Sequence, residues 1–313
     1  MKKILALTSS IILLGTMAFA LTGCSDSPFV KALQNASDKT GNITATFDGI
    51  EIVSDTADLT FVPSNECKIE YTTHKRITYS TEVENGVLKI KLEDSRHWFE
   101  KMFSLGDSSK LTVYLPAGEY SSLTIKQATG DINVPADYKF GSVNIKLSTG
   151  DTKFSASASE AIEICTSTGD ITLENVSCGS LKTKVSTGKT TLTNVAVAGD
   201  AAITVSNGKS FLTNVSCTNF TSTGDTGDIN MTSLIASERI DITRTTGDVY
   251  FGGCDAAEIY VETKTGDVNG TFLTDKIFQA HTSSGKINVP ECWEGGKCKI
   301  TTTTGKIEIS IGQ

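Results

Sequence analysis

Ser167-Thr168-Gly169-Asp170-Ile171 is the stretch that decides the fold, because its Thr-Gly turn returns along the chain at a fixed period. The ten turn glycines are Gly130, Gly150, Gly169, Gly188, Gly208, Gly227, Gly247, Gly266, Gly285 and Gly305. Their successive spacings are 20, 19, 19, 20, 19, 20, 19, 19 and 20 residues. Such a period predicts a repeat architecture, in which each unit buries its apolar face against its neighbours.

Apolar and polar residues alternate on both sides of each turn. With the turn glycine as position zero, positions −7, −5, +2 and +4 are mostly Ile, Val, Leu or Phe. Positions −6, −4, +1 and +3 are mainly Thr, Lys, Asp, Glu or Asn. Each repeat is therefore predicted to be two short strands with one buried face and one Thr-rich outer face. Glycine is expected at the turn, since one residue of so tight a turn takes a positive φ.

Two folds fit this alternation. In an antiparallel meander, Thr-Gly would be a two-residue hairpin turn; in a parallel solenoid, equivalent strands of successive repeats would pair. A constant repeat length favours the solenoid, because like residues then stack on like residues. We therefore predict an all-β protein: a parallel β-solenoid (β-helix) of about ten rungs of 19–20 residues. The pattern leaves its handedness open.

The N-terminus is typical of an exported protein. A basic start, Met1-Lys2-Lys3, precedes the apolar run Ile4–Ala20, and Leu21-Thr22-Gly23-Cys24 follows. This layout indicates a secretory signal rather than a membrane-spanning segment. It resembles the signal of bacterial lipoproteins, which implies that Cys24 is the first mature residue and carries the lipid. The alternatives are an ordinary cleaved signal with a coincidental cysteine and an uncleaved anchor.

The rest of the chain is predicted to form one folded domain. Residues 1–23 are the signal peptide, and 24–40, small and polar, are a flexible tether. Residues 41–313 are the solenoid, with irregular N-terminal rungs and a cap over 41–120 and regular repeats over 121–313. The alternative for 41–120 is a separate small β-domain.

Two features stand out within the irregular region. Asn85-Gly86 between alternating segments predicts a tight hairpin turn. The insertion 95–105 breaks the strand pattern and predicts a short amphipathic turn. It serves either as the cap of the repeat array or as a surface for a partner or the membrane. Its candidate partner-binding residues are Trp98, Phe99, Met102 and Phe103.

The charge of the chain argues against one class of partner. Removing residues 1–23 takes away Lys2 and Lys3, which leaves 26 basic and 36 acidic side chains and a net charge of −10. This field disfavours binding to nucleic acid or to an anionic surface. The signal places the folded part outside the cytoplasm, anchored to the cell membrane through the lipid on Cys24.

Seven cysteines follow Cys24, so at least one thiol of an exported chain stays unpaired. Cys254 and Cys292 both occupy position +7, where other repeats carry a buried valine or leucine: Val176, Val195, Val215, Leu234 and Leu273. Cys178 and Cys217 lie two repeats apart, about 9–10 Å, which is too far for a disulfide. Cys292 and Cys298 are the candidate disulfide, and buried free thiols are the alternative.

Position +1 carries the row of side chains that most resembles a ligand-binding site. It holds the weak metal candidates Asp131, Asp151, Asp170, Asp228, Asp248 and Asp267, and lysines at Lys189, Lys209, Lys286 and Lys306. Aspartates on adjacent rungs can chelate a hard cation such as Ca²⁺. They are equally explained as solvated turn residues, and their spacing differs from that of calcium-binding β-repeats. We therefore predict no metal site.

No arrangement of residues indicates catalysis. His74, His97 and His281 lie far apart in the sequence, and none accompanies a nucleophile. The chain has no phosphate-binding loop, zinc-ligand spacing or serine elbow. The prediction is a protein without cofactors that is not an enzyme.

Three features carry a resemblance to a known family: the stretch Lys110-Leu111-Thr112-Val113-Tyr114-Leu115-Pro116, the segment Leu123-Thr124-Ile125 after it, and the repeated Ser-Thr-Gly-Asp-Ile turns. Through them the sequence resembles the bacterial putative-adhesin β-strand-repeat family, a domain of unknown function. The resemblance covers roughly residues 43–311. It implies a β-helical protein of the cell envelope, often tethered to the membrane, for which adhesion has been suggested. It implies no catalytic residues.

The sequence thus predicts a lipid-anchored β-solenoid of the bacterial cell envelope that acts as a non-catalytic, adhesin-like binding or scaffolding surface. Its outer Thr, Asp and Lys rows would hold an extended polymer such as an envelope polysaccharide. One alternative is an envelope-stress or assembly factor that contacts a membrane protein through the 95–105 insertion. A polysaccharide-active β-helix enzyme is the other alternative.

Overall fold

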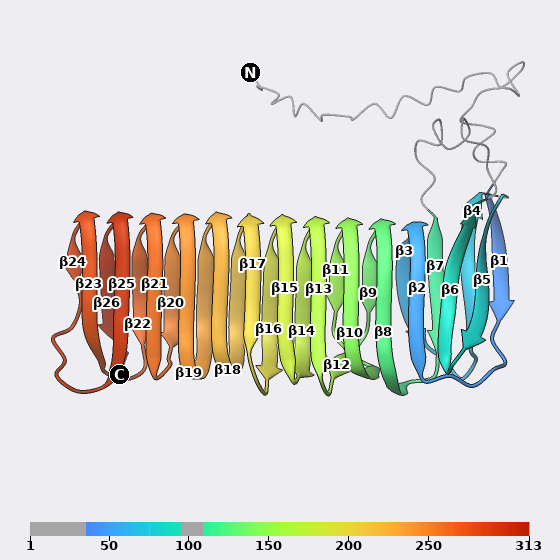
Figure 1. Ribbon diagram of the computed structural model, residues 1–313, viewed down its shortest axis with the longest axis horizontal. Helices are drawn as coiled ribbons and strands as arrows, with labels where there is room; N and C mark the ends of the chain where they lie inside the picture. Colours follow the sequence, from blue (N-terminus) through green and yellow to red (C-terminus); the bar gives the residue numbers. More distant parts are fainter. Residues whose placement is uncertain (1–35, 75, 95–108, 313) are drawn as a thin grey trace, which may run out of the picture.

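The computed structural model describes residues 36–74, 76–94 and 109–312, and every element in them is a β-strand. The strands stack into a straight rod with the Thr-Gly turns aligned along one edge (Figure 1). Equivalent strands of successive rungs pair in parallel and in register, so Val143 pairs with Ile162, which pairs with Leu181. This confirms the parallel solenoid and excludes the meander.

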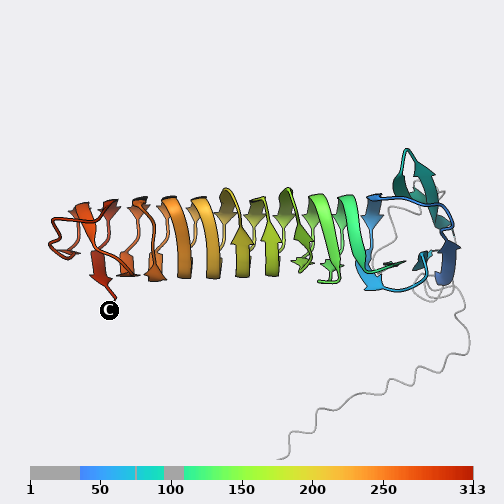
Figure 2. The ribbon, with the colours of Figure 1, turned by 90° about the horizontal axis from the view of Figure 1, so that it is seen from below.

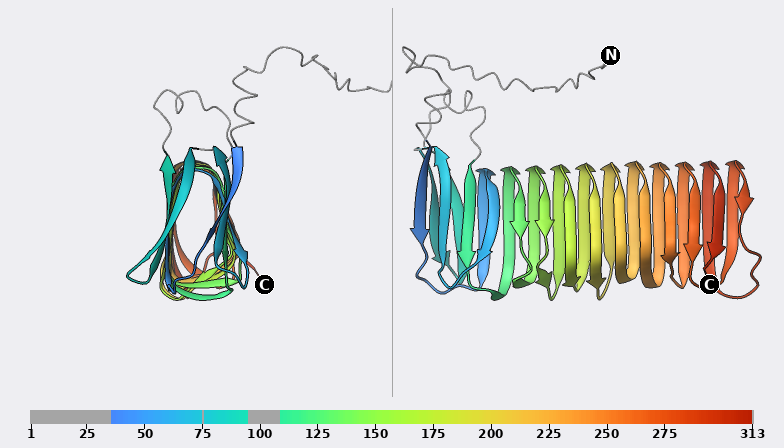
Figure 3. Two further views of the ribbon diagram at one scale, coloured as in Figure 1. Left: turned by 90° about the vertical axis from the view of Figure 1, so that its right-hand side faces the viewer. Right: turned by 180° about the vertical axis from the view of Figure 1, so that it is seen from behind.

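Each rung is a flattened loop of two strands that pack face to face (Figure 3). Strands that lead into a turn form what we call the first stack, and strands that leave a turn form the second stack. The first stack contains β8 (Gly118–Thr129), β10 (Tyr138–Thr149), β13 (Ala161–Thr168), β15 (Ser180–Thr187), β17 (Ala201–Asn207), β21 (Glu258–Thr265), β23 (Lys276–Ser284) and β25 (Gly296–Thr304).

The second stack returns the chain to the far edge of the rod. It contains β9 (Ile132–Val134), β11 (Thr152–Phe154), β14 (Ile171–Cys178), β16 (Thr190–Val197), β20 (Val249–Cys254), β22 (Val268–Phe272), β24 (Ile287–Asn288) and β26 (Ile307–Ile311), with the short β12 (Ser157–Ala158) at its edge. Two strands run on from the second stack into the next rung of the first: β18 (Ser210–Thr226) and β19 (Ile229–Thr246).

The core lies between the two stacks and is continuous along the rod. The predicted inward rows at −7, −5, +2 and +4 are buried along the rod, and Ile145, Ile164 and Ile171 are each 0% exposed. The terminal rung is the exception, since Ile287 at its +2 position is 46% exposed. Because each rung covers the apolar side chains of the one before it, the rows form a single core. No second domain is needed to bury them.

The turns stack so closely that only glycine fits. Gly169 has φ 131°, and a Cβ there would lie 2.0 Å from the carbonyl oxygen of Gly150. The backbone ladder also continues through the turns, since the N–H of Gly150 donates to the carbonyl of Thr168 at 2.9 Å. The glycine is therefore required by its backbone conformation, as predicted, and also by the rung-to-rung contact.

The irregular N-terminal strands belong to the same stack rather than to a separate domain. β2 (Gly49–Thr56) pairs in parallel with β8, and β3 (Asp58–Pro63) pairs with β9 and with β7 (Lys110–Leu115). β5 (Ile77–Glu84) and β6 (Val87–Asp94) form an antiparallel hairpin that projects to the side of the rod (Figure 2). Its turn is Asn85-Gly86 with φ of 53° and 78°, as predicted.

The outermost strand at this end is β1 (Ala36–Asn42), which pairs antiparallel with β4 (Lys68–His74). β4 also pairs antiparallel with β7. The predicted tether extended to residue 40, whereas the first strand already begins at Ala36.

Spatial order differs from chain order at both ends of the rod (Figure 1). The last rung in the chain, β25 with β26, lies between the rung of β21 and β22 and the rung of β23 and β24. Likewise β2 lies between β8 and β6, although it precedes both in the chain. At each end of the rod the chain therefore places one segment out of chain order between two others.

The sequence prediction of a buried row at +7 is wrong for two residues. Leu273 is 51% exposed. The strand after Gly266 reaches the buried place opposite Cys254 one residue earlier than the strand after Gly247 does, so Phe272 occupies that place instead of Leu273. The extra residue on the strand after Gly247 is Gly253, which bends the chain with φ 63°. Cys292 lies after β24, where the chain leaves the stack to reach the inserted rung, and is only half-buried.

Candidate functional site

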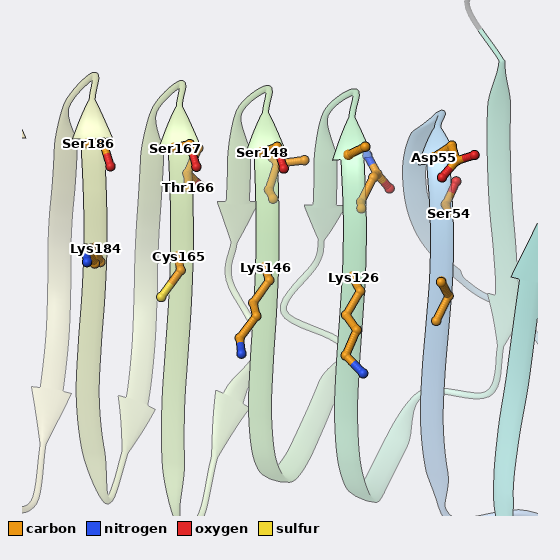
Figure 4. Close-up of a pocket in the computed structure, with 14 residues that line it drawn as sticks. Ser54, Asp55, Lys126, Lys146, Ser148, Cys165, Thr166, Ser167, Lys184 and Ser186 are labelled. Atoms are coloured by element: carbon orange, nitrogen blue, oxygen red, sulfur yellow. The ribbon is translucent and has the colours of Figure 1, made fainter. Parts of the chain in front are cut away.

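A shallow groove of about 600 Å³ crosses the outer face of the first stack near its N-terminal end (Figure 4). It spans five neighbouring strands: β2, β8, β10, β13 and β15. We call it the Lys/Ser groove. Its lining residues are Val53, Ser54, Asp55, Lys126, Gln127, Ala128, Lys146, Leu147, Ser148, Cys165, Thr166, Ser167, Lys184 and Ser186.

The side chains of the groove are placed by strand alternation. Positions −4 and −2 of each rung point outward, because −5 and −3 point to the core. In register, Lys126 pairs with Lys146, Lys146 with Cys165, and Cys165 with Lys184. These four residues therefore form one row along the rod, with about 4.8 Å between neighbouring strands. A parallel row of hydroxyls, Ser148, Ser167 and Ser186, lies nearer the turns (Figure 4).

Two lysines of this row have no acidic partner. Among the described residues, no carboxylate lies within ion-pair distance of Lys146 or Lys184. The Nζ of Lys126 lies 3.6 Å from the Oε1 of Glu51, and both side chains are substantially exposed. An exposed pair of this kind contributes only about 0–1 kcal/mol. The groove therefore presents amino groups that are free to meet a negatively charged ligand.

Cys165 lies in the middle of the lysine row, and its Sγ is 4.0 Å from the Oε1 of Glu163. Burial raises the pKa of this thiol, and the charge of Glu163 raises it further. The charges of Lys182, Lys146 and Lys184 act in the opposite direction. Because the net shift is upward, the thiol stays protonated at neutral pH and is a weak nucleophile.

We expect Glu163→Gln to lower the pKa of Cys165 and to accelerate its alkylation near pH 8, because the substitution removes a negative charge beside the thiol. Lys184→Gln should raise the pKa and slow the reaction. The measurement is the pH dependence of iodoacetamide alkylation, in protein whose half-buried Cys67 and Cys292 are serine. Identical pH midpoints in all three proteins would contradict this electrostatic description.

The aspartates at +1 form a second row, along the turn edge of the rod, where their role is structural. In four contacts along one part of the row and three along another, a backbone N–H at +1 donates to the Oδ1 of the aspartate on the preceding rung, at 2.8–3.2 Å. The acceptors are Asp58, Asp131, Asp151, Asp170, Asp228, Asp248 and Asp267.

Lysines extend this aspartate ladder where the residue at position +1 changes from aspartate to lysine. The Nζ of Lys189 lies 3.0 Å from Asp170 Oδ2, and that of Lys209 lies 2.8 Å from Asp228 Oδ2. Backbone donors thus serve every carboxylate of the ladder, and lysines contact two of them as well. In the ranges that the structure describes, no three His, Cys, Asp or Glu residues are grouped so that they could hold a metal ion.

Removing one carboxylate of the ladder should destabilise the stack. We expect Asp151→Ala to lower the free energy of unfolding by about 1 kcal/mol, because the N–H of Asp170 loses its acceptor. Asp151→Asn keeps an oxygen acceptor and should lose less than half of that amount. Asp225→Ala, at an exposed aspartate, is the control. Urea denaturation measures all three, and a rise in melting temperature on adding Ca²⁺ would contradict the structural role.

Several predicted site residues lie outside the described residues. These are the lipidation residue Cys24 and the insertion residues Trp98, Phe99, Met102 and Phe103. All seven cysteines from Cys67 onward are free thiols, so Cys292 and Cys298 form no disulfide here. Cys298 lies in the buried −7 row between Ile259 and Phe278, which turns its thiol into the core, away from the segment that carries Cys292.

A third row, an asparagine ladder at +6 of the second stack, was not predicted from the sequence. Asn175, Asn194 and Asn214 adopt φ of 57°, 54° and 54°. The Nδ2 of Asn194 donates to the Oδ1 of Asn175, and the Nδ2 of Asn214 donates to the Oδ1 of Asn194, each at 2.9 Å. Asparagine suits this left-handed bend, because it tolerates positive φ better than most residues. The recurring Thr-Asn-Val triplets of Thr193–Val195 and Thr213–Val215 would have revealed it.

Comparisons with solved structures find proteins of similar extent. A putative adhesin from Parabacteroides merdae is 14% identical, with 88% of this chain and 96% of that chain covered and a TM-score of 0.48. A putative adhesin from Bacteroides fragilis is 11% identical, with 88% and 97% covered and a TM-score of 0.42. A putative lipid binding protein from Parabacteroides distasonis is 13% identical, with 88% and 97% covered and a TM-score of 0.34.

The family comparison is more direct. A comparison with curated proteins finds no match. The family model described as Toastrack DUF4097 matches residues 47–209 and again residues 199–313. The two matches together span nearly all of the described rungs, in agreement with the resemblance carried by the Thr-Gly-Asp turns. The protein therefore belongs to the Toastrack DUF4097 family.

Proposed function

We propose that this protein is a lipid-anchored, non-catalytic binding surface of the bacterial cell envelope that holds an extended polymer along the Lys/Ser groove. The observation that carries the proposal is the groove itself, which crosses five strands in register and aligns lysines and serine hydroxyls parallel to the rod. A repeating surface of this kind is complementary to a ligand that also repeats, because successive units can make the same contact.

The shape of the groove supports a polymer rather than a small ligand. Binding sites for small molecules are usually concave and enclose most of the ligand. The Lys/Ser groove instead lies open on the outer face of a flat stack (Figure 4). A chain lying along it would contact each rung weakly and gain affinity from the number of contacts.

The chemistry of the groove supports binding rather than catalysis. Its single thiol, Cys165, has a raised pKa and so lacks the thiolate character of a catalytic cysteine. The lysines Lys146 and Lys184 are exposed and lack the apolar burial that activates catalytic lysines.

The proposed anchor would place the rod in a defined orientation. β1, which begins at Ala36, lies at the N-terminal end of the stack, opposite the C-terminal rungs (Figure 1). The segment between Cys24 and Ala36 can extend over at most about 40 Å. Anchoring at Cys24 would therefore keep the N-terminal end, and the Lys/Ser groove near it, closest to the membrane. No helix in the described ranges is long and apolar enough to cross a membrane.

Lipid anchoring is tested by Cys24→Ser. The proposal expects wild-type protein to partition with membranes and to incorporate a labelled fatty acid, and expects the variant to lose the label. A labelled variant, or a wild-type protein without label, would refute the anchor.

Polymer binding is tested with a panel of purified envelope polysaccharides. The wild-type chain should bind at least one of them, and Ser148→Ala/Ser167→Ala/Ser186→Ala should weaken that binding. Thr172→Ala/Thr191→Ala/Thr213→Ala, on the second stack, is the matched control and should bind as the wild type does. Failure of the whole panel, or equal loss in both variants, would count against the groove.

A further inference from the structure

We infer that the ligand of the Lys/Ser groove is a linear polyanion whose charges are phosphate groups, held by Lys126, Lys146 and Lys184. This inference rests on the proposed function, because it names the chemical class of the polymer that the groove would hold. It concerns the same surface and adds a requirement for negative charge.

The local charge of the groove has the opposite sign to that of the whole chain. The lining contains three lysines and one acidic residue, Asp55, whereas the chain carries a net charge of −8. Charges farther away than the Debye length, about 8 Å at physiological ionic strength, are largely screened. Within that distance Glu51 and Glu163 are paired with Lys126 and Lys182. A ligand in the groove therefore meets the unpaired amino groups of Lys146 and Lys184, with Asp55 as the one carboxylate of the lining.

The row is basic only along the groove. Beyond Lys184, position −4 continues with Thr204, Thr223 and Thr243 and then with Glu262. The lysines are thus concentrated on neighbouring rungs at one end of the rod and are not a property of every repeat. An arrangement needed only for solubility would have no reason to gather there.

The combination of groups fits phosphate. Lysine binds phosphate as a point charge, and serine hydroxyls commonly donate to phosphate oxygens. The hydroxyls of Ser148 and Ser186 share their rungs with Lys146 and Lys184, and Ser167 lies on the rung between them. Among the described residues no carboxylate lies within ion-pair distance of Lys146 or Lys184, so only the exposed contact between Lys126 and Glu51 competes with the ligand.

The spacing fits a flexible chain. Lys126 and Lys146 lie on adjacent strands, about 5 Å apart along the rod, and Lys184 lies about 10 Å beyond, past the strand of Cys165. A flexible polymer can bring successive charges to each amino group in turn. Simultaneous engagement of three sites then raises the overall affinity above that of any one contact.

The test uses long-chain inorganic polyphosphate as the probe and the mature chain as the protein. We expect wild type to bind it, and Lys126→Gln/Lys146→Gln/Lys184→Gln to bind about ten- to a hundredfold more weakly. The control, Lys264→Gln/Lys286→Gln/Lys299→Gln, changes the net charge equally at three exposed lysines and should bind within about twofold of wild type. Equal loss in the two variants would overturn the assignment to the groove.

Salt dependence gives a second readout. For three neutralised charges, the logarithm of the wild-type association constant should fall against the logarithm of salt with a slope of about −2. The groove variant should have a slope near zero. Polyglutamate binding as tightly as polyphosphate would overturn the choice of phosphate. If a neutral polysaccharide binds and polyphosphate does not, this inference fails while the proposed function stands; if neither binds, both fail.

Discussion

Gly208→Ala is expected to lower the free energy of unfolding by about 3–5 kcal/mol, a loss at the upper end for single substitutions. A Cβ at this turn would lie 1.7 Å from the carbonyl oxygen of Gly188 on the preceding rung, and Gly208 has φ 142°. The clash is between the Cβ, which has no rotamers, and a backbone oxygen, so no side-chain movement can relieve it. The two rungs must separate, which breaks the hydrogen bonds and the core contacts between them.

The matched control is Gly253→Asn. Gly253 also has a positive φ, 63°, but a Cβ there would meet only Leu273 Cδ2, at 3.6 Å. Asn175, Asn194 and Asn214 already occupy the equivalent bend on other rungs. We expect this substitution to change stability by less than about 0.5 kcal/mol. Urea unfolding followed by far-ultraviolet circular dichroism compares the two, and equal midpoints for Gly208→Ala and wild type would contradict the close stacking of turns.

The second large effect is expected at the buried ion pair that secures the C-terminal rung. Lys276 lies in β23, and its Nζ is 2.6 Å from the Oδ1 of Asp255, with side-chain exposures of 2% and 17%. To reach Asp255, the lysine passes Gly296 in the inserted β25, where a Cβ would lie 3.3 Å from Lys276 Cδ. The pair therefore joins the terminal rung to the body of the rod across the inserted rung.

We expect Lys276→Met to cost about 3 kcal/mol, because Asp255 is left charged and largely buried without its partner. Lys276→Met/Asp255→Asn should recover part of this loss, since the buried charge is then removed as well. Lys306→Met, which breaks the exposed contact with Glu308, should cost less than about 0.5 kcal/mol. Thermal unfolding measures all three; a double variant less stable than Lys276→Met would show that the pair does not act as a unit.

Much of the architecture could be predicted because the same sequence pattern occurs in every repeat. Every rung repeats the same alternation around its glycine, so the buried rows, the turn positions and the parallel register follow from any few copies. The hairpin at Asn85-Gly86 was equally predictable, since its φ values of 53° and 78° suit those two residue types.

The order of the terminal rungs could not be predicted, and the reason is the same repetition. The apolar rows of β25 and β26 fit against β21 and β22 as well as against β23 and β24. A pattern that every rung shares carries no information about which rung is the neighbour. The distinguishing contacts, such as that between Lys276 and Asp255, involve individual residues outside the repeated rows.

Arg244 is a second feature that could not be predicted from the sequence. It points to the core at position −3, is 3% exposed, and donates from Nη2 to the Oγ of Ser222 at 2.8 Å. Burial lowers the pKa of its guanidinium to about 10. The space comes from Gly224 on the neighbouring rung, where a Cβ would lie 2.7 Å from Nη1. An inward arginine is predictable only when both rungs are considered together.

The Lys/Ser groove was present in the sequence but was not singled out. The rows at −4 and −2 can be written from the repeat alone, and Lys126, Lys146 and Lys184 stand in the first of them. What the structure added is that five strands are adjacent and in register, so the lysines share one surface with a row of serines.

The most direct test of the account is a thiol footprint with envelope polymer. In protein whose Cys67 and Cys292 are serine, Cys165 reports on the Lys/Ser groove, and an added Thr191→Cys reports on the second stack; both positions are half-buried. The account predicts that a polymer fraction bound by the protein slows alkylation of Cys165 severalfold and leaves the cysteine at position 191 unchanged. Equal protection at both positions, or bound polymer without protection of Cys165, would contradict it.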